Sequence, residues 1–284
     1  MKTGLVLEGG GMRGLYTAGV LDALMEQDIQ IDGVVSVSAG ALFGVNLLSK
    51  QPGRALRYNL KYIADKRYMG LGHLLRTGNV INQQFAYYEV PFKLDVFDQG
   101  TFAKAKIPFY VVITNVETGQ AEYVNIVDVF QQMEVLRATS SMPLVSQMVD
   151  LNGVKYLDGG IADSIPVEFA QSLGFDKLIV VLTRPKAYRK KRSNIQLIRN
   201  VYRAYPNLVT SIQNRYRVYN QTLDTIEDLT KKGQVYVIQP SRTIKVKRIE
   251  KNPKRLEAIH QLGYQDFQSQ ASSLMKYLNK LSES

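Results

Sequence analysis

The chain has 284 residues, of which 45% are hydrophobic, and a formal net charge of +11 at pH 7, a size that allows one substantial core with an appended region. The absence of cysteine excludes disulfides and thiolate metal sites, and the two histidines, His73 and His260, limit mechanisms that need imidazole. No run of about 18 apolar residues occurs, and the stretch before Glu8 lacks the pattern of a secretory signal, so we expect neither a membrane span nor secretion.

Two strand–glycine–helix units open the predicted fold. Residues 4–8 read as a short buried strand, the glycine-rich residues 9–14 follow, and residues 15–27 have apolar positions at helical spacing. Residues 31–37 and 39–49 repeat the pattern of strand and helix. Units of this kind in tandem favour a parallel sheet with helices on its faces.

The middle of the chain is less regular. Residues 51–65 look helical, whereas residues 66–100 combine aromatic residues with scattered glycines and predict a cap or a site wall rather than a regular element. The further elements predicted before residue 185 are strands at 107–116, 154–157 and 177–183, a turn followed by a strand within 118–125, and helices at 127–139 and 166–173.

The last third of the chain differs in charge. Residues 1–185 carry 16 Lys and Arg against 18 Asp and Glu, whereas residues 186–284 carry 20 against 7. The later region comprises a basic connector at 186–192, helices over 195–231 interrupted at Pro206, a strand at 234–239 and a helix at 254–280. We therefore predict a catalytic domain over 1–185 and a basic, mainly helical extension over 186–284, packed on the core.

The segment G-G-G-M-R-G at 9–14 has three interpretations. It satisfies the G-x-G-x-x-G pattern of dinucleotide sites, but such a site needs an acidic residue at the end of the second strand, and Asp32 stands at its start. It also suits an oxyanion hole, because the N–H groups of Gly10 and Gly11 are unshielded at the positive end of a helix. The third interpretation is a tight turn that merely requires glycine.

Two further motifs each have a chemical and a structural interpretation. Ser38 lies in S-V-S-A-G, close to the G-x-S-x-G elbow that projects a serine from a strained turn; Gly40 fits the pattern, whereas Ser36 adds a Cβ. The alternative is a serine that caps a helix. Asp158, followed by two glycines, suits either a general base or an ordinary turn.

These motifs all follow predicted strands, at the sheet edge where sites of open α/β folds form. Together they supply a nucleophile, a base and anion donors. A Ser-His-Asp triad would need His73 or His260, but both stand in segments typical of surface or packing histidines. A Ser-Asp dyad is the simpler hypothesis.

In order and spacing, these motifs resemble those of the patatin-like phospholipases. The resemblance rests on G-G-G-M-R-G, S-V-S-A-G, D-G-G at 158–160 and L-R-A-T-S-S-M-P-L-V at 136–145, and it covers roughly residues 3–185. The segments Y-N-Q-T-L, V-Y-V-I-Q-P-S and V-K-R-I-E-K resemble the C-terminal extension of a bacterial subgroup. The family resemblance implies a three-layer α/β/α sandwich with a mostly parallel central sheet, and hydrolysis of lipid acyl esters without a metal or cofactor.

The resemblance also implies roles for individual residues. Ser38 would be the nucleophile and Asp158 the base. The oxyanion and substrate-binding residues would be Gly9, Gly10, Gly11 and Arg13, and the supporting residues would be Gly14, Ser36, Gly40, Gly159 and Gly160. Because Ser36 replaces the family's usual glycine, the alternative is a weak or inactive relative that binds anionic membranes.

The basic extension has three interpretations: a solvated face, a surface for anionic lipid, or tyrosines and arginines that stack on nucleobases. No nucleic-acid motif supports the last one. We therefore expect a lipid ester substrate, peripheral contact of this extension with anionic membrane, no nucleic acid, and a cytoplasmic location, in part at the inner face of the membrane.

Overall fold

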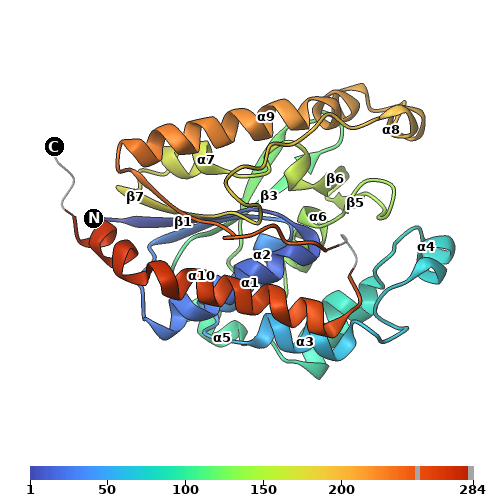
Figure 1. Ribbon diagram of the computed structural model, residues 1–284. Helices are drawn as coiled ribbons and strands as arrows, with labels where there is room; N and C mark the ends of the chain where they lie inside the picture. Colours follow the sequence, from blue (N-terminus) through green and yellow to red (C-terminus); the bar gives the residue numbers. More distant parts are fainter. Residues whose placement is uncertain (247–249, 281–284) are drawn as a thin grey trace.

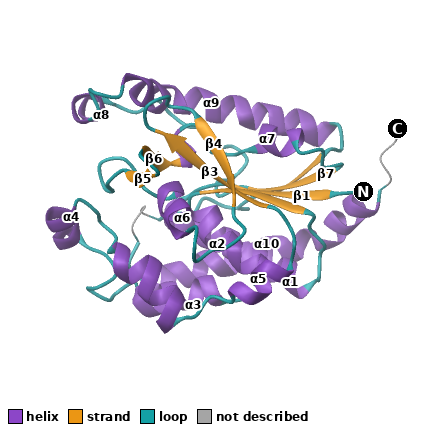
Figure 2. Cartoon of the chain, turned by 180° about the vertical axis from the view of Figure 1, so that it is seen from behind, coloured by secondary structure: helices purple, strands orange, loops and turns teal. Residues whose placement is uncertain are grey.

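A mixed sheet lies between two layers of helices in the computed structural model (Figure 1, Figure 2). The structure describes residues 1–246 and 250–280, so residues 247–249, within the V-K-R-I-E-K segment, and residues 281–284 lie outside it. Within the described residues the sheet has eight strands: β1 (Thr3–Leu7), β2 (Gly33–Val37), β3 (Phe109–Asn115), β4 (Ala121–Asn125), β5 (Val149–Leu151), β6 (Val154–Asp158), β7 (Lys177–Val181) and β8 (Val235–Ile238).

The strand order is β5-β6-β3-β2-β1-β7-β8, with β4 also paired to β3. The run from β3 to β8 is parallel, whereas β4 and β6 pair with β3 in the antiparallel sense and β5 pairs with β6 in the same way. The predicted three-layer sandwich with a mostly parallel sheet is therefore confirmed. The hairpin of β5 and β6 was predicted only in part, because β5 has three residues and no apolar run.

Helices cover both faces of the sheet. One layer contains α1 (Gly14–Glu26), α2 (Ala39–Leu48), α3 (Arg54–Tyr62), α5 (Gln99–Lys104) and α10 (Pro253–Asn279), and the other contains α7 (Val167–Ser172) and α9 (Pro206–Lys231). Alternate residues of β1 serve the two layers, because Leu5 and Leu7 join the core beneath α1 while Val6 joins the core beneath α7 and α9. This double burial explains the continuous apolar runs of the parallel strands.

Residues after 185 contribute to every layer. The strand β8 extends the sheet beside β7, α9 lies on one face and α10 packs against α1 on the other. The helix α9 begins at Pro206, which occupies its first turn, and the short helix α8 (Gln196–Val201) precedes it, so the predicted interruption at Pro206 is confirmed.

Two predictions of local structure are wrong. Residues 66–100 contain α4 (Leu71–Thr77) and a π-helix at Gln84–Leu94, in which Phe85 and Tyr87 are buried; Phe85 makes an edge-to-face contact with Tyr62. The helix predicted at 127–139 is shorter, since α6 spans Met133–Thr139. The Gln132 side chain accepts hydrogen bonds from the N–H groups of Val127 and Asp128 and holds the preceding residues in turns.

Candidate active site

Two strands meet end to end along one edge of β3. The last residue of β2, Val37, pairs with Val112, and the last residue of β6, Asp158, pairs with the next residue of β3, Ile113. The opposite edge of β3 is occupied by β4 from Tyr110 to Thr114, so β2 and β6 must share the remaining edge. Because β6 runs antiparallel, its end approaches the end of β2, and Ser38 is brought against Asp158.

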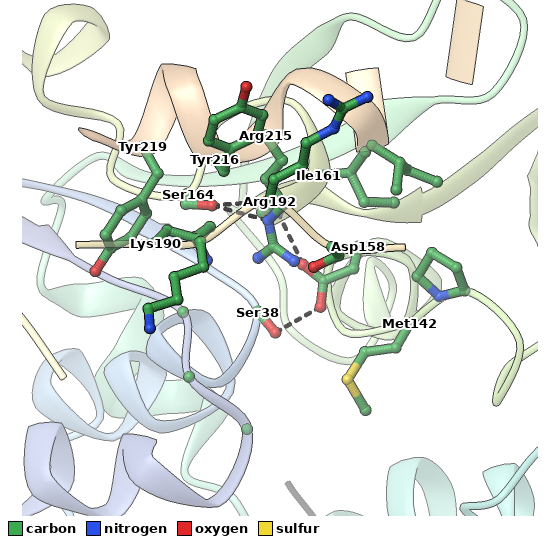
Figure 3. A pocket seen from close by; sticks show the side chains of 18 of the residues that line it. Ser38, Met142, Asp158, Ile161, Ser164, Lys190, Arg192, Arg215, Tyr216 and Tyr219 are labelled. Carbon is green, nitrogen blue, oxygen red and sulfur yellow. Dashed lines mark hydrogen bonds between the residues drawn. The ribbon is translucent and has the colours of Figure 1, made fainter. Parts of the chain in front are cut away.

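The Ser38 side chain donates a hydrogen bond of 2.8 Å from Oγ to Oδ2 of Asp158 (Figure 3). Both residues are buried, with exposed fractions of 8% and 6%. Ser38 has φ 55° and ψ −126°, a conformation that is rare and strained for a residue with a side chain. Its N–H donates to Oγ1 of Thr139 at 2.8 Å, and that hydroxyl donates to the carbonyl of Val112, so α6 and β3 fix the turn.

Three separate segments hold Asp158. Its other carboxylate oxygen, Oδ1, accepts a hydrogen bond of 2.8 Å from the N–H of Gly160. Its own N–H donates to the carbonyl of Ser141, and its carbonyl accepts from the hydroxyl of Thr114. The carboxylate therefore has a fixed orientation toward Ser38, set by backbone on both sides of it.

The glycine-rich segment runs beside Ser38. It follows β1 and leads into a short 3₁₀ turn, Gly11–Arg13, and then α1. A Cβ added at Gly9 would lie 3.0 Å from the Cβ of Ser38, which places this backbone in contact with the serine. Within the described residues, the N–H groups of Gly10 and Gly11 have no hydrogen-bond acceptor. These groups lie at the N-terminal end of helical backbone, where a negative charge is stabilised.

Three glycines of the motifs, Gly14, Gly40 and Gly159, lie where a side chain would clash with neighbouring atoms. A Cβ at Gly40 would lie 2.7 Å from the carbonyl oxygen of Leu7, and one at Gly159 would lie 2.0 Å from that of Val112. A Cβ at Gly14 would lie 2.7 Å from the Cβ of Ala39. These contacts explain why the turns of all three motifs contain glycine.

Ser36, by contrast, fits its place. It lies in β2, fully buried, and its hydroxyl donates a hydrogen bond of 3.0 Å to the carbonyl of Tyr110 on β3. Its φ is not in the left-handed region. The local strain therefore resides at Ser38.

A cavity of about 850 Å³ opens over Ser38 and Asp158. Its apolar wall includes Met142, Leu144, Ile161, Ile195, Ile198 and Ile212. Its basic wall includes Arg13, Arg184, Lys190 and Arg215. Lys190 and Tyr219 lie on one side of the Ser38–Asp158 pair and Met142 lies on the other (Figure 3). The cavity is thus amphipathic, with the hydrogen-bonded pair between its two walls.

The geometry supports neither a dinucleotide site nor a Ser-His-Asp triad. Asp32 accepts a hydrogen bond from the N–H of Thr3, at the opposite end of β2 from the glycine-rich segment. His260 lies 2.7 Å from the carboxylate of Asp22, His73 lies 2.9 Å from a backbone carbonyl, and neither lines the cavity. In the described part of the chain, no three His, Asp or Glu residues are grouped to hold a metal ion. No helix among those residues is long and apolar enough to span a bilayer.

Comparison with known proteins decides the family. The sequence profile described as "Patatin-like phospholipase" matches residues 5–170, more than half of the chain. The chain belongs to the patatin-like phospholipase family. A second profile, a domain of unknown function named DUF6363, matches residues 205–279.

The individual proteins to which the chain is similar are distant in sequence. The uncharacterized protein YjjU of Escherichia coli is 28% identical over 258 residues, which cover 86% of this chain and 70% of YjjU. Lysophospholipase NTE1 of Mycosarcoma maydis is 26% identical over 262 residues, which cover 84% of this chain but only 13% of NTE1. The crystal structure of VipD from Legionella pneumophila matches with a TM-score of 0.47 and 15% identity, covering 96% of this chain and 67% of VipD.

Several residues around the Ser38–Asp158 pair were not singled out from the sequence. Thr139 was visible only inside the segment L-R-A-T-S-S-M-P-L-V, where no periodicity distinguishes it. Lys190 and Arg215 belong to runs of basic and tyrosine residues that were interpreted as packing or solvated surface. Their charge was visible, but not the direction of their side chains, because the connector at 186–192 has no regular period.

Proposed function

We propose that the protein is a serine acyl hydrolase that cleaves acyl esters of lipids, with Ser38 as nucleophile and Asp158 as general base. The observation that carries this proposal is the 2.8 Å hydrogen bond between Ser38 Oγ and Asp158 Oδ2, made by a serine in a strained turn at the base of a cavity. Because neither His73 nor His260, both in the described part of the chain, lines this cavity, the carboxylate itself is the group positioned to accept the proton.

The reaction would take two steps. Asp158 takes the proton of Ser38 while Oγ attacks the ester carbonyl, and the alcohol leaves with that proton as the acyl-enzyme forms. Water then enters, gives a proton to Asp158 and attacks the acyl group, which releases the fatty acid and restores the serine. The N–H groups of Gly10 and Gly11 are proposed to hold the oxyanion in both steps, with Gly9 and Arg13 supporting that loop.

An amphipathic lipid suits the two walls of the cavity. The apolar wall accepts an acyl chain, and the basic wall faces the polar end of the substrate. The family and the lysophospholipase names of several relatives support a lipid ester over a soluble one. We propose no cofactor, since each proton and bonding electron pair is supplied by the pair, the substrate and water.

A fluorophosphonate probe tests this proposal. We expect covalent labelling of the wild type and none of Ser38→Ala, together with hydrolysis of a panel of acyl esters by the wild type alone. Asp158→Asn keeps the shape of the site but cannot accept a proton, so turnover should fall by at least about a hundredfold. Normal turnover by Asp158→Asn would exclude the dyad, and labelling that persists in Ser38→Ala would exclude Ser38 as nucleophile.

We further propose that the protein contacts anionic membrane, at the inner face of the bilayer, through the end of the molecule where α8 contributes Ile198 to the cavity. The helices α4 and α8 both lie at this end (Figure 1, Figure 2). They expose apolar side chains, with exposed fractions of 74% for Leu71, 87% for Leu75 and 62% for Leu197. Exposed Arg76 and Arg199 lie on the same two helices. Apolar tips accompanied by cations are typical of surfaces that insert into anionic interfaces.

A further inference from the structure

The basic wall of the cavity carries more positive charge than its carboxylates can balance. Among the described residues, seven basic side chains line the cavity, against the two carboxylates of Glu8 and Asp158. Four of the basic side chains come from four different segments: Arg13 from the glycine-rich turn, Arg184 after β7, Lys190 from the connector and Arg215 from α9. The fold therefore gathers these cations from positions far apart in the sequence.

The four cations are close enough to affect one another. Burial, and then the charge of Arg215, lowers the pKa of Lys190 to about 7. Burial, and then the charge of Arg184, lowers the pKa of Arg13. Like charges held together away from water cost free energy, and an anion between them would recover part of that cost.

Three of these cations, Arg13, Arg184 and Lys190, have no ion-pair partner among the described residues. Glu8 is occupied by neutral donors, since its carboxylate accepts from the N–H of Thr183 at 2.5 Å and from the hydroxyl of Tyr219 at 2.8 Å. The Nε of Arg13 is buried and has no hydrogen-bond acceptor among the described residues.

Hydrogen bonds to the backbone of Lys190 fix the position of this residue. The side-chain amide of Asn220 on α9 accepts from the N–H of Lys190 at 2.8 Å and donates to its carbonyl at 3.1 Å. The ammonium lies 4.3 Å from the centre of the Tyr219 ring, on the same side of the dyad (Figure 3). The position of this cation is thus set before any ligand arrives, which lowers the entropy lost on binding.

We propose that Arg13, Arg184, Lys190 and Arg215 bind the phosphate of an anionic lipid headgroup and so select lysophospholipids of net negative charge; this rests on the proposed acyl hydrolase function. Guanidinium and ammonium groups form strong charge-assisted bonds to phosphate. A choline headgroup would place its own cation against the same cluster, so zwitterionic lipids are disfavoured. The same chemistry would accept free phosphate, and the experiment separates the two sources.

Three lipids with the same oleoyl chain test the selection: lysophosphatidylglycerol, lysophosphatidylcholine and monooleoylglycerol. We expect the wild type to have the highest kcat/KM for lysophosphatidylglycerol. Lys190→Gln and Arg184→Gln should each lower the ratio of kcat/KM for lysophosphatidylglycerol to that for monooleoylglycerol by about tenfold, because each removes one charged partner of the phosphate. The matched control is Lys232→Gln, an exposed lysine after α9 and outside the cavity, which should leave this ratio unchanged.

A second arm does not depend on catalysis. Thermal unfolding of Ser38→Ala is followed with glycerophosphoglycerol, glycerophosphocholine or inorganic phosphate added. The proposal expects stabilisation by glycerophosphoglycerol, less by glycerophosphocholine, and weaker effects in Ser38→Ala/Lys190→Gln.

The outcomes separate the two proposals. Ester hydrolysis without headgroup preference, with no stabilisation by glycerophosphoglycerol, overturns the headgroup site and leaves the acyl hydrolase standing. Stabilisation by inorganic phosphate alone also overturns it, in favour of a free-anion site. Absence of fluorophosphonate labelling and of hydrolysis contradicts the acyl hydrolase, while the thermal arm still decides whether the cations bind the headgroup.

Discussion

At the scale of single residues, the structure explains how Ser36 is accommodated where the G-x-S-x-G motif has its first glycine. The Ser36 hydroxyl has a buried acceptor, the carbonyl of Tyr110, and the strained backbone lies two residues later, at Ser38. The elbow motif was therefore recognisable from sequence with a serine in place of the first glycine. The sequence did not show that the strand containing Tyr110 would pair with Ser36, since Tyr110 lies 74 residues further along the chain.

Ser36→Gly should consequently weaken the fold rather than improve the site. The substitution removes a buried hydrogen bond and places glycine inside a strand, which together should lower the free energy of unfolding by about 1–2 kcal/mol. Hydrolysis of a short-chain ester should change little. Urea unfolding and initial rates check this, and a large gain in turnover would show that Ser36 does strain the elbow.

Lys190 predicts a pH dependence that is specific to anionic substrates. Its pKa is lowered to about 7, so the ammonium is mostly charged at pH 6 and mostly neutral at pH 8. The groups that act on it are the guanidinium groups of Arg13, Arg184 and Arg215 and the carboxylate of Glu8. The ratio of kcat/KM for lysophosphatidylglycerol to that for monooleoylglycerol should fall as the pH rises through 7.

Binding of the phosphate and protonation of Lys190 are thermodynamically linked. A bound phosphate favours the charged ammonium and raises its pKa, so the fall in kcat, which reports the complex, should occur at higher pH than the fall in kcat/KM. The phosphodiester stays singly charged over this range, and ionisation of the shared dyad cancels in the ratio. Lys190→Gln should lose this pH dependence; a ratio that falls equally in wild type and variant would contradict the assignment to Lys190.

At the scale of elements, the strands of the parallel sheet were predictable and the antiparallel corner was not. The strands β1, β2, β3 and β7 are apolar on both faces, so each forms a recognisable run. The sequence also predicted where β6 ends. It did not predict whether β6 runs parallel or antiparallel to β3, because the residue pattern of a five-residue strand is the same in both cases. The meeting of Ser38 with Asp158 depends on that direction, so the motifs could suggest the pair, whereas hydrophobic periodicity could not.

The seam between α1 and α10 depends on two glycines. A Cβ at Gly19 would lie 2.0 Å from the carbonyl oxygen of His260, and one at Gly263 would lie 2.0 Å from that of Tyr16. Gly263→Ala should push the helices apart and lower the free energy of unfolding by about 2–3 kcal/mol, despite the better helix propensity of alanine. Gly72→Ala in α4 is the matched control, because nothing lies within 4 Å of its added Cβ. Thermal unfolding compares the two; equal stability would mean that the seam relaxes without cost.

At the scale of the whole molecule, the sequence showed that the last third of the chain is basic, but it did not show where these basic side chains lie in the fold. The excess of Lys and Arg after residue 185 was read from composition alone. In the structure, part of it lines the cavity and part lies on exposed surfaces, because the chain after β7 passes the site before it forms α9, β8 and α10. Composition reports how much charge a region carries, whereas its function depends on a path through space that only the packed fold defines.

The proposed membrane surface joins exposed apolar side chains to that charge. Replacing Leu71 and Leu75 together by Asp removes two large apolar groups that touch little protein, so the fold should be retained. Binding to vesicles that contain phosphatidylglycerol should weaken by about 10- to 100-fold, since each leucine loses its transfer to lipid. Hydrolysis of a short-chain soluble ester should persist. Met275→Asp changes an exposed residue near the C-terminal end of α10, an end that lies far from α4 and α8 (Figure 1), and this variant should bind vesicles as the wild type does. Co-sedimentation at low and high salt measures both contributions, because the cationic part weakens with ionic strength and the apolar part does not. Equal vesicle binding by the wild type and the Leu71/Leu75 variant would assign the contact to another face.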